Sequence, residues 1–138
     1  MIAGRLRGEL DDVHIISSDR FRGRVYDRIL REVDAMLGKH EVLVVDATFY
    51  RKKWRERLRE LASGRDRVVT VFVDCSLETC LRRNLERKDP IPDAAIHVIW
   101  NEFERPEDPE FYIDTEKLGV EEAVDKILRK IGYYPAQN

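Results

Sequence analysis

The chain has 138 residues, a length typical of one domain, and 43% of them are apolar, which is enough for a single core. Its 25 Lys and Arg residues against 27 Asp and Glu residues give a formal net charge of −2, so the overall charge indicates neither a nucleic-acid coat nor a membrane surface. The longest apolar run is far too short to span a bilayer, and the N-terminal stretch has no signal-peptide core. We therefore expect a cytoplasmic protein that forms a single domain over residues 1–138 and has no membrane partner.

Strands and helices are predicted to alternate along the chain. Apolar runs predict the strands, and apolar positions at helical spacing, with a stop at Gly38 and an N-cap at Ser76, predict the helices. Alternating elements with uninterrupted apolar strands favour an α/β fold, in which a mostly parallel sheet is covered by helices on both faces. The expected strands are 13–18, 41–46, 67–74 and 111–113, and the expected helices are 24–37, 50–62, 76–87, 93–103 and 120–131.

Four carboxylates follow these strands, at the point where each apolar run stops. Ligands of parallel α/β sheets bind beyond the carboxyl ends of the strands, so these positions indicate where a site should lie. Aspartate is also a common turn residue, and any one of the four can be structural. We predict a functional role for Asp19 and Asp46, and turn chemistry for Asp74 and Asp114.

Arginines accompany these carboxylates. The stretch SSDRFR places Arg22 three residues after Asp19, so that the carboxylate can accept a proton or hold a metal-bound water while the arginine binds a polar or anionic substrate. The stretch LRRNLER places Arg83 and Arg87 on one helix face, with Arg82 beside them. Such a pair can bind phosphate oxygens, or it can be a solvated helix surface.

The segment around residues 83–106 is predicted to be a lid. The arginine helix is followed by the chain break KDPIPD, by an amphipathic helix and by a second break, ERPEDPE. A helix that carries phosphate-binding groups and is joined through such breaks is typical of a segment that closes over a ligand.

Taken together, these stretches resemble the P-loop kinases. SSDRFR, VVDATFYRKKWR, FVDCSLETCLRRNLERKDPIPDAAIHVIWNEFERP and FYIDTEKLGVEEAVDKIL are similar to the adenylylsulfate kinase and L-seryl-tRNA(Sec) kinase groups, and the lid is the most specific part of the match. The resemblance covers the chain from about Val13 to Ile131. It implies ATP-dependent transfer of a phosphoryl group to a hydroxyl of a small molecule or of an aminoacyl-tRNA, with Mg²⁺ as cofactor.

The resemblance also implies a role for each site residue. Asp46 would be the Walker B acid that holds Mg²⁺, and Asp19 would face both the metal and the substrate hydroxyl. Arg22 would bind the substrate. The lid arginines Arg82, Arg83 and Arg87 would bind the ATP phosphates, with Arg83 and Arg87 also offsetting the charge that develops during transfer.

The chain departs from the family at the phosphate-binding loop. The 138 residues contain no G-x-x-x-x-G-K-S/T, and the resemblance implies that the family's first strand, its loop and most of the next helix would lie before Met1. Without that central strand, 41–46 and 67–74 would expose facing edges, close together, or borrow a strand from a second copy to give a homodimer. Two explanations stay open: a shortened kinase, which the retained aspartates and arginines favour, or a remnant that only binds RNA or protein.

The RNA-binding alternative depends on the stretch RKKWRERLRE. Basic residues around Trp54 can bind phosphates while the ring stacks on a base. Trp54 also shares an apolar helix face with Leu58 and Leu61, and we expect it in the core, with the basic residues as a solvated face. Cys75 and Cys80 lack the clustered partners that a zinc site needs, and we expect reduced thiols.

Overall fold

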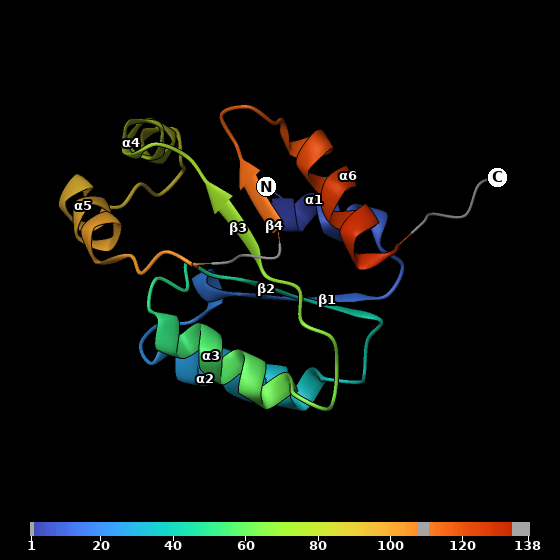
Figure 1. Cartoon of the computed structure of the whole chain (residues 1–138). Coiled ribbons are helices and arrows are strands. Elements are labelled where there is room, and N and C mark those ends of the chain that lie inside the picture. Colours follow the sequence, from blue (N-terminus) through green and yellow to red (C-terminus); the bar gives the residue numbers. More distant parts are fainter. Residues whose placement is uncertain (1, 108–110, 134–138) are drawn as a thin grey trace.

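The computed structural model describes residues 2–107 and 111–133 and has the expected alternation of strands and helices (Figure 1). Parallel strands flanked by helices confirm the predicted α/β class. In chain order the elements are α1 (Ile2–Glu9), β1 (Val13–Ser17), a 3₁₀ helix η1 (Ser18–Arg20), α2 (Val25–Met36), β2 (Val42–Asp46), α3 (Lys52–Ala62), β3 (Val71–Asp74), α4 (Leu77–Leu85), α5 (Asp93–Glu102), β4 (Phe111–Asp114) and α6 (Val120–Ile131).

Two element boundaries differ from the expected ones by several residues. The strand expected over 67–74 begins only at Val71, because its pairing with β4 starts at the register pair Val71 and Phe111. The helix expected over 76–87 ends at Leu85. Here the amide of Glu86 donates to the Arg83 carbonyl three residues back at 3.2 Å, so the last turn tightens into 3₁₀ geometry.

The strands form two separate parallel pairs. β1 pairs with β2, from Val13 opposite Val42 to Ser17 opposite Asp46. β3 pairs with β4, and this pairing ends with Asp74 opposite Asp114. Over the described residues no strand is hydrogen-bonded between β2 and β3, so each keeps one edge without a strand partner. Of the three arrangements considered for these neighbours, closure onto each other is therefore wrong.

Two apolar clusters hold the pairs of strands in place. The larger cluster lies under α1 and α6 and reaches both pairs, while the smaller one lies between the first pair and helices α2 and α3 (Figure 1). The helices contribute through apolar residues three and four apart, which form one face of each helix. The buried members are Leu6, Leu10, Ile113, Ala123, Val124, Ile127 and Leu128 in the first cluster, and Ile16, Ile29 and Val33 in the second.

The second strand pair differs from the expected sheet, which had helices on both faces. Ile113 of β4 is fully buried against the larger cluster. On the other face, Phe72 contacts Phe103 with ring centroids 5.6 Å apart, and the Arg105 guanidinium lies 5.3 Å from the Phe72 ring centroid. A returning segment of chain, and not a helix, therefore covers that face, and Tyr112 there is 50% exposed.

In the part of the chain that the structure describes, no helix has the length and apolar character needed to cross a membrane.

Candidate active site

The two aspartates predicted to be functional lie at the same edge of the first strand pair. Asp46 is the last residue of β2, and its register partner in β1 is Ser17. Asp19 follows two residues later in η1, where its amide donates to the Ser17 hydroxyl at 3.4 Å. Both carboxylates are exposed, and neither has a salt bridge to any residue in the described ranges. The fold thus brings together two carboxylates that are free to bind a ligand.

The loop after Asp46 is held by residues that the sequence analysis did not identify. The Phe49 amide donates to the Tyr26 hydroxyl at 2.9 Å, and the Arg55 guanidinium donates to the Phe49 carbonyl at 2.5 Å. Burial raises the pKa of Tyr26. Phe49 itself has a φ of +45°, a conformation that non-glycine residues rarely adopt without such support. Tyr26 lies outside the quoted stretches, and Arg55 entered only as one of the basic residues of RKKWRERLRE, so their contacts across elements are what reveal this positioning role.

Arg22 is the exposed cation that follows Asp19 in the chain. It lies between η1 and α2 and has no hydrogen bond or salt bridge to the rest of the described chain. Arg20, by contrast, pairs with Glu32, which also accepts a bond from His14 Nε2 at 2.9 Å. Burial opposes the charge on Glu32, but Arg20 and His14 outweigh it and lower the pKa of that carboxyl. Of the two arginines in the stretch SSDRFR, Arg22 is therefore the one without a partner in the described chain.

The start of α4 is held by a small hydroxyl–carboxylate network. The Ser76 side chain accepts a bond from the Thr79 amide at 3.2 Å, which confirms the predicted N-cap. The hydroxyls of Ser76 and Thr79 both donate to the Glu116 carboxylate, at 3.0 and 2.5 Å. The hydrogen bond from the Thr79 hydroxyl, followed by the one from the Ser76 hydroxyl, lowers the pKa of Glu116. This network fixes α4 against the connection between β4 and α6.

The three arginines of α4 and its end have different surroundings. The Arg83 guanidinium donates to the Thr115 hydroxyl at 2.7 Å and to the Thr115 carbonyl at 3.2 Å, so it is directed at the connection between β4 and α6. Arg82 and Arg87 are exposed, and neither guanidinium is bonded to another residue of the described ranges. Arg82 and Arg87 are thus free for an anionic ligand, whereas Arg83 would first have to leave Thr115.

The segment that returns from α5 joins the ends of two strands. The Glu104 amide donates to the Tyr50 carbonyl at 2.8 Å, in the loop that follows Asp46. Its neighbour Arg105 pairs with Asp74 at 2.9 Å, at the end of β3. Figure 1 shows α4 and α5 together at the end of the molecule toward which the strands point. The end of the predicted lid segment therefore contacts both the loop after Asp46 and the end of β3.

The two aspartates predicted as turn residues have different contacts. Asp114 accepts a bond from the Glu116 amide at 2.9 Å, two residues on, which is the predicted turn chemistry. The side chain of Asp74 instead accepts bonds from Arg105 at 2.9 Å and from the Tyr112 hydroxyl at 2.7 Å. The predicted turn role of the Asp74 side chain is therefore wrong, because this side chain binds residues that are distant in the sequence.

The carboxylates fit one kind of metal site and not another. Mg²⁺ in phosphoryl-transfer sites is held by one or two carboxylates together with phosphate oxygens and water, and Asp19 and Asp46 match the carboxylate part of that set. Within the described ranges no group of three or more His, Cys, Asp or Glu side chains could hold a metal by itself. The donor set therefore fits a magnesium ion that arrives with phosphates, and not an all-protein metal centre.

The basic helix α3 is largely occupied by its own contacts. Trp54 is half-buried outside both buried clusters, so its expected place in the core is correct only in part. Its ring stacks on Tyr26, with centroids 5.2 Å apart, and Lys53 and Arg57 lie 5.1 and 4.7 Å from its centroid. A nucleic-acid base would have to displace these neighbours to stack on Trp54.

The two thiols lie close together at the base of α4. Cys75 and Cys80 are free cysteines. Burial, and then the hydrogen bond with Cys75, raise the pKa of Cys80 to about 12, so this thiol stays protonated at neutral pH. The reduced state expected for both cysteines agrees with this arrangement.

Comparison with known proteins gives three kinds of match. The sequence model of the AAA domain matches residues 2–106. The chain is 41% identical to the L-seryl-tRNA(Sec) kinase of Mus musculus over 65 residues, 46% of this chain and 18% of that protein. It is 35% identical to the adenylyl-sulfate kinase of Bacteroides thetaiotaomicron over 83 residues, 54% of this chain and 40% of that protein. The chain thus spans less than half the length of these curated relatives. The tunicamycin resistance protein of Deinococcus radiodurans has the same fold, with a TM-score of 0.71 and 18% identity over 99% of this chain and 93% of the other.

Proposed function

Because the chain belongs to the AAA domain family, with the match covering residues 2–106, we propose that it is an ATP-dependent phosphotransferase domain that acts on a hydroxyl group. The chain is a kinase-like P-loop domain related to both kinase groups that its sequence resembles, so the predicted family is confirmed. The acceptor would be a small molecule or an aminoacyl-tRNA, the two classes that the resemblance suggests. In this proposal residues 1–138 form one cytoplasmic domain, with a lid over about 83–106.

The observation that carries the proposal is the placement of Asp19 and Asp46. They follow neighbouring parallel strands, are exposed, and have no cationic partner in the described chain. Bound Mg²⁺–ATP would supply the phosphoryl group and the positive charge that the two carboxylates would bind. Asp46 and Asp19 would hold the metal, and Asp19 would accept the hydroxyl proton from a substrate that Arg22 orients.

The lid arginines complete the proposed site. Arg82 and Arg87 would bind phosphate oxygens as they stand, because their guanidinium groups are exposed and unpaired in the described chain. Arg83 would bind phosphate oxygens, or the negative charge of the transition state, only after its hydrogen bonds to Thr115 had broken. Closure of residues 83–106 is the motion that would break these bonds.

One observation supports a second candidate, a non-catalytic domain that binds RNA or protein. The 138 residues contain no G-x-x-x-x-G-K-S/T, whose backbone amides and lysine hold the nucleotide phosphates in P-loop enzymes. The unpaired edges of β2 and β3 offer such a domain a place to bind an extended strand, including one from a second copy.

Transfer of labelled phosphate from ATP to hydroxyl acceptors tests the proposal. We would compare this chain with the same chain extended upstream by a strand and a glycine-rich loop. Asp46→Asn and Asp19→Asn in the active form should lower the rate by about 10²-fold or more, because each removes a carboxylate from the reacting groups. Asp125→Asn, on the exposed side of α6, is the matched control. If both forms are inert with every hydroxyl acceptor, the domain is the non-catalytic one.

A further inference from the structure

The solvent side of α2 carries three arginines that the proposed site does not use. Arg24, Arg28 and Arg31 follow one another at helical spacing, on the side opposite the buried residues Ile29 and Val33. All three are exposed, and none has a side-chain hydrogen bond or salt bridge within residues 2–107 and 111–133. We refer to these three residues as the α2 arginines.

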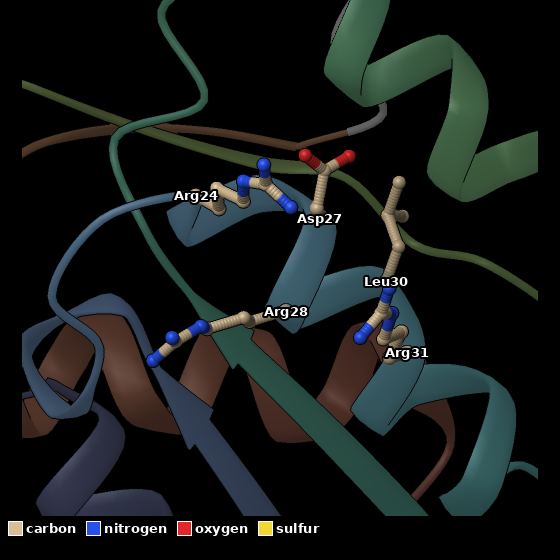
Figure 2. Close-up of a pocket in the computed structure, with 5 residues that line it drawn as sticks. All are labelled: Arg24, Asp27, Arg28, Leu30 and Arg31. Carbon is tan, nitrogen blue, oxygen red and sulfur yellow. The ribbon is translucent and has the colours of Figure 1, made fainter.

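The α2 arginines line a pocket of about 330 Å³ together with Asp27 and Leu30. Figure 2 shows these side chains projecting from successive positions of α2, with Arg28 extending away from Asp27. Asp27 is the acidic residue of this lining, so the lining carries three positive groups and one negative group. The pocket therefore keeps an excess of positive charge that an anion can neutralise.

The other acidic residues of α2 do not reduce this excess, because each is paired with a cation from elsewhere. Glu32 is bound by Arg20 and by His14. Asp34 is bound by Arg65 at 2.7 Å. The charge of the α2 arginines is thus left for a partner outside the described chain.

The basic residues of the neighbouring helix α3 are already engaged. Arg51 pairs with Glu102 at 3.1 Å, and Arg55 donates to two backbone carbonyls. Lys53 and Arg57 lie against the Trp54 ring. The stretch RKKWRERLRE is the more conspicuous in the sequence, yet the arginines of α2 are the ones that the fold leaves available.

We propose that the α2 arginines bind the phosphodiester backbone of a nucleic acid. A guanidinium matches a phosphate with two parallel hydrogen bonds, and arginine is the residue preferred for this contact. At 1.5 Å per residue, the row from Arg24 to Arg31 is about 10 Å long, enough to meet more than one phosphate. Leu30 is the single apolar residue of the pocket lining, so the surface lacks the apolar centre of a protein–protein interface. This proposal does not depend on phosphoryl transfer.

Fluorescence anisotropy tests the proposal with the full chain, without ATP, against labelled single-stranded RNA and DNA of one sequence. Each phosphate contact should contribute about 0.7 to the slope of log affinity against log salt, so three contacts predict a slope of about −2. The variant Arg24→Gln/Arg28→Gln/Arg31→Gln should lose at least about tenfold in affinity and flatten this slope. The control Arg7→Gln/Lys126→Gln/Lys130→Gln removes the same charge from α1 and α6 and should leave both quantities nearly unchanged. Thermal unfolding verifies that both variants fold.

The outcomes separate the proposal from its rivals. Equal binding of RNA and DNA supports contact with the shared backbone, and a preference for RNA supports it with an added contact to the 2′-hydroxyl. Equal losses in the α2 and control variants would mean diffuse charge and overturn the proposal. So would competition by polyglutamate as effective as that by unlabelled RNA, or a wild-type chain that binds neither probe at low salt. None of these results depends on whether the chain transfers phosphate.

Discussion

Asn84 and Ile91 exchange two hydrogen bonds across the connection between α4 and α5. The Asn84 amide nitrogen donates to the Ile91 carbonyl at 2.7 Å, and the Ile91 amide donates back to the Asn84 oxygen at 3.1 Å. Asn84 is 5% exposed, although it lies on the outermost pair of helices. The Asn84 side chain thus gives the Ile91 amide and carbonyl the hydrogen bonds that a strand or helix would otherwise provide. These two bonds fix the shape of the connection at the base of the proposed lid.

Asn84→Ala should therefore destabilise the domain by about 1–3 kcal/mol, because it leaves both backbone groups of Ile91 without their partner. Urea unfolding at neutral pH measures the loss, and hydrogen exchange of the Ile91 amide locates it. Asn101→Ala, at an exposed position of α5, should change stability by less than about 0.5 kcal/mol. Unchanged exchange at Ile91 in the Asn84 variant would contradict this account.

The Glu116 network makes one contribution to stability depend on pH. Because the Thr79 and Ser76 hydroxyls lower the pKa of Glu116 from its ordinary 4.5, the folded chain binds this proton less readily than the unfolded chain. The stabilisation is therefore complete above the ordinary pKa and is lost as the pH falls through the lowered one. The melting temperature of Glu116→Gln should lie below that of the wild type at neutral pH and approach it in acid. Glu86→Gln, which touches no such network, should show no gap that closes in this way.

Substitutions of Arg83 and of Arg82 should differ in their effect on the stability of the domain, although both side chains are exposed on the same helix. Arg83→Gln removes the two bonds to Thr115 and should cost up to about 1 kcal/mol, the scale of an exposed charged contact. Arg82→Gln should cost nothing measurable, and its effect should be confined to nucleotide binding. Chemical denaturation of the two variants without ligand makes the comparison. Equal unfolding midpoints would mean that the Thr115 contact contributes nothing.

Two register partners in the second strand pair provide a matched test of the core. Ile113 is fully buried under α1 and α6, whereas Val73 opposite it is 46% exposed. Ile113→Ala should cost about 2–5 kcal/mol, as for other large-to-small changes in a packed core. Val73→Ala should cost less than about 1 kcal/mol, because nearly half of the Val73 surface stays in contact with water in the folded chain. Thermal unfolding followed by circular dichroism measures both, and similar losses would place the core elsewhere.

Features with a local signal could be predicted from the sequence, and features made by distant contacts could not. The cap at Ser76, the end of β2 at Asp46 and the Asp114 turn depend on residues next to one another in the chain. The pairing of Arg105 with Asp74 joins positions 31 apart, and that of Arg83 with Thr115 joins positions 32 apart. No periodic pattern of residues in the sequence predicts such long-range pairs. The sequence thus predicted the cap, the strand end and the turn, but not which side chains are bound by distant partners.

The α2 arginines illustrate the same limit. Sequence alone drew attention to the denser basic stretch of α3, because it counts charges without knowing their partners. Glu32 and Asp34 form ion pairs with arginines outside α2, so they do not neutralise the positive charge of the α2 arginines. Availability of a side chain is a property of its neighbours in space, and those neighbours are distant in the chain.

Every strand in the described part of the molecule lies at the margin of a two-stranded ribbon. Successive backbone amides along a strand point to opposite sides, so in each ribbon only alternate amides meet a carbonyl of the other strand. Isotope labelling should reveal this as a two-residue rhythm, with slow and rapid deuterium uptake alternating along β2 and β3. An isolated ribbon of this kind is barely stable in water, and the cohesion of the molecule must therefore come from its helices.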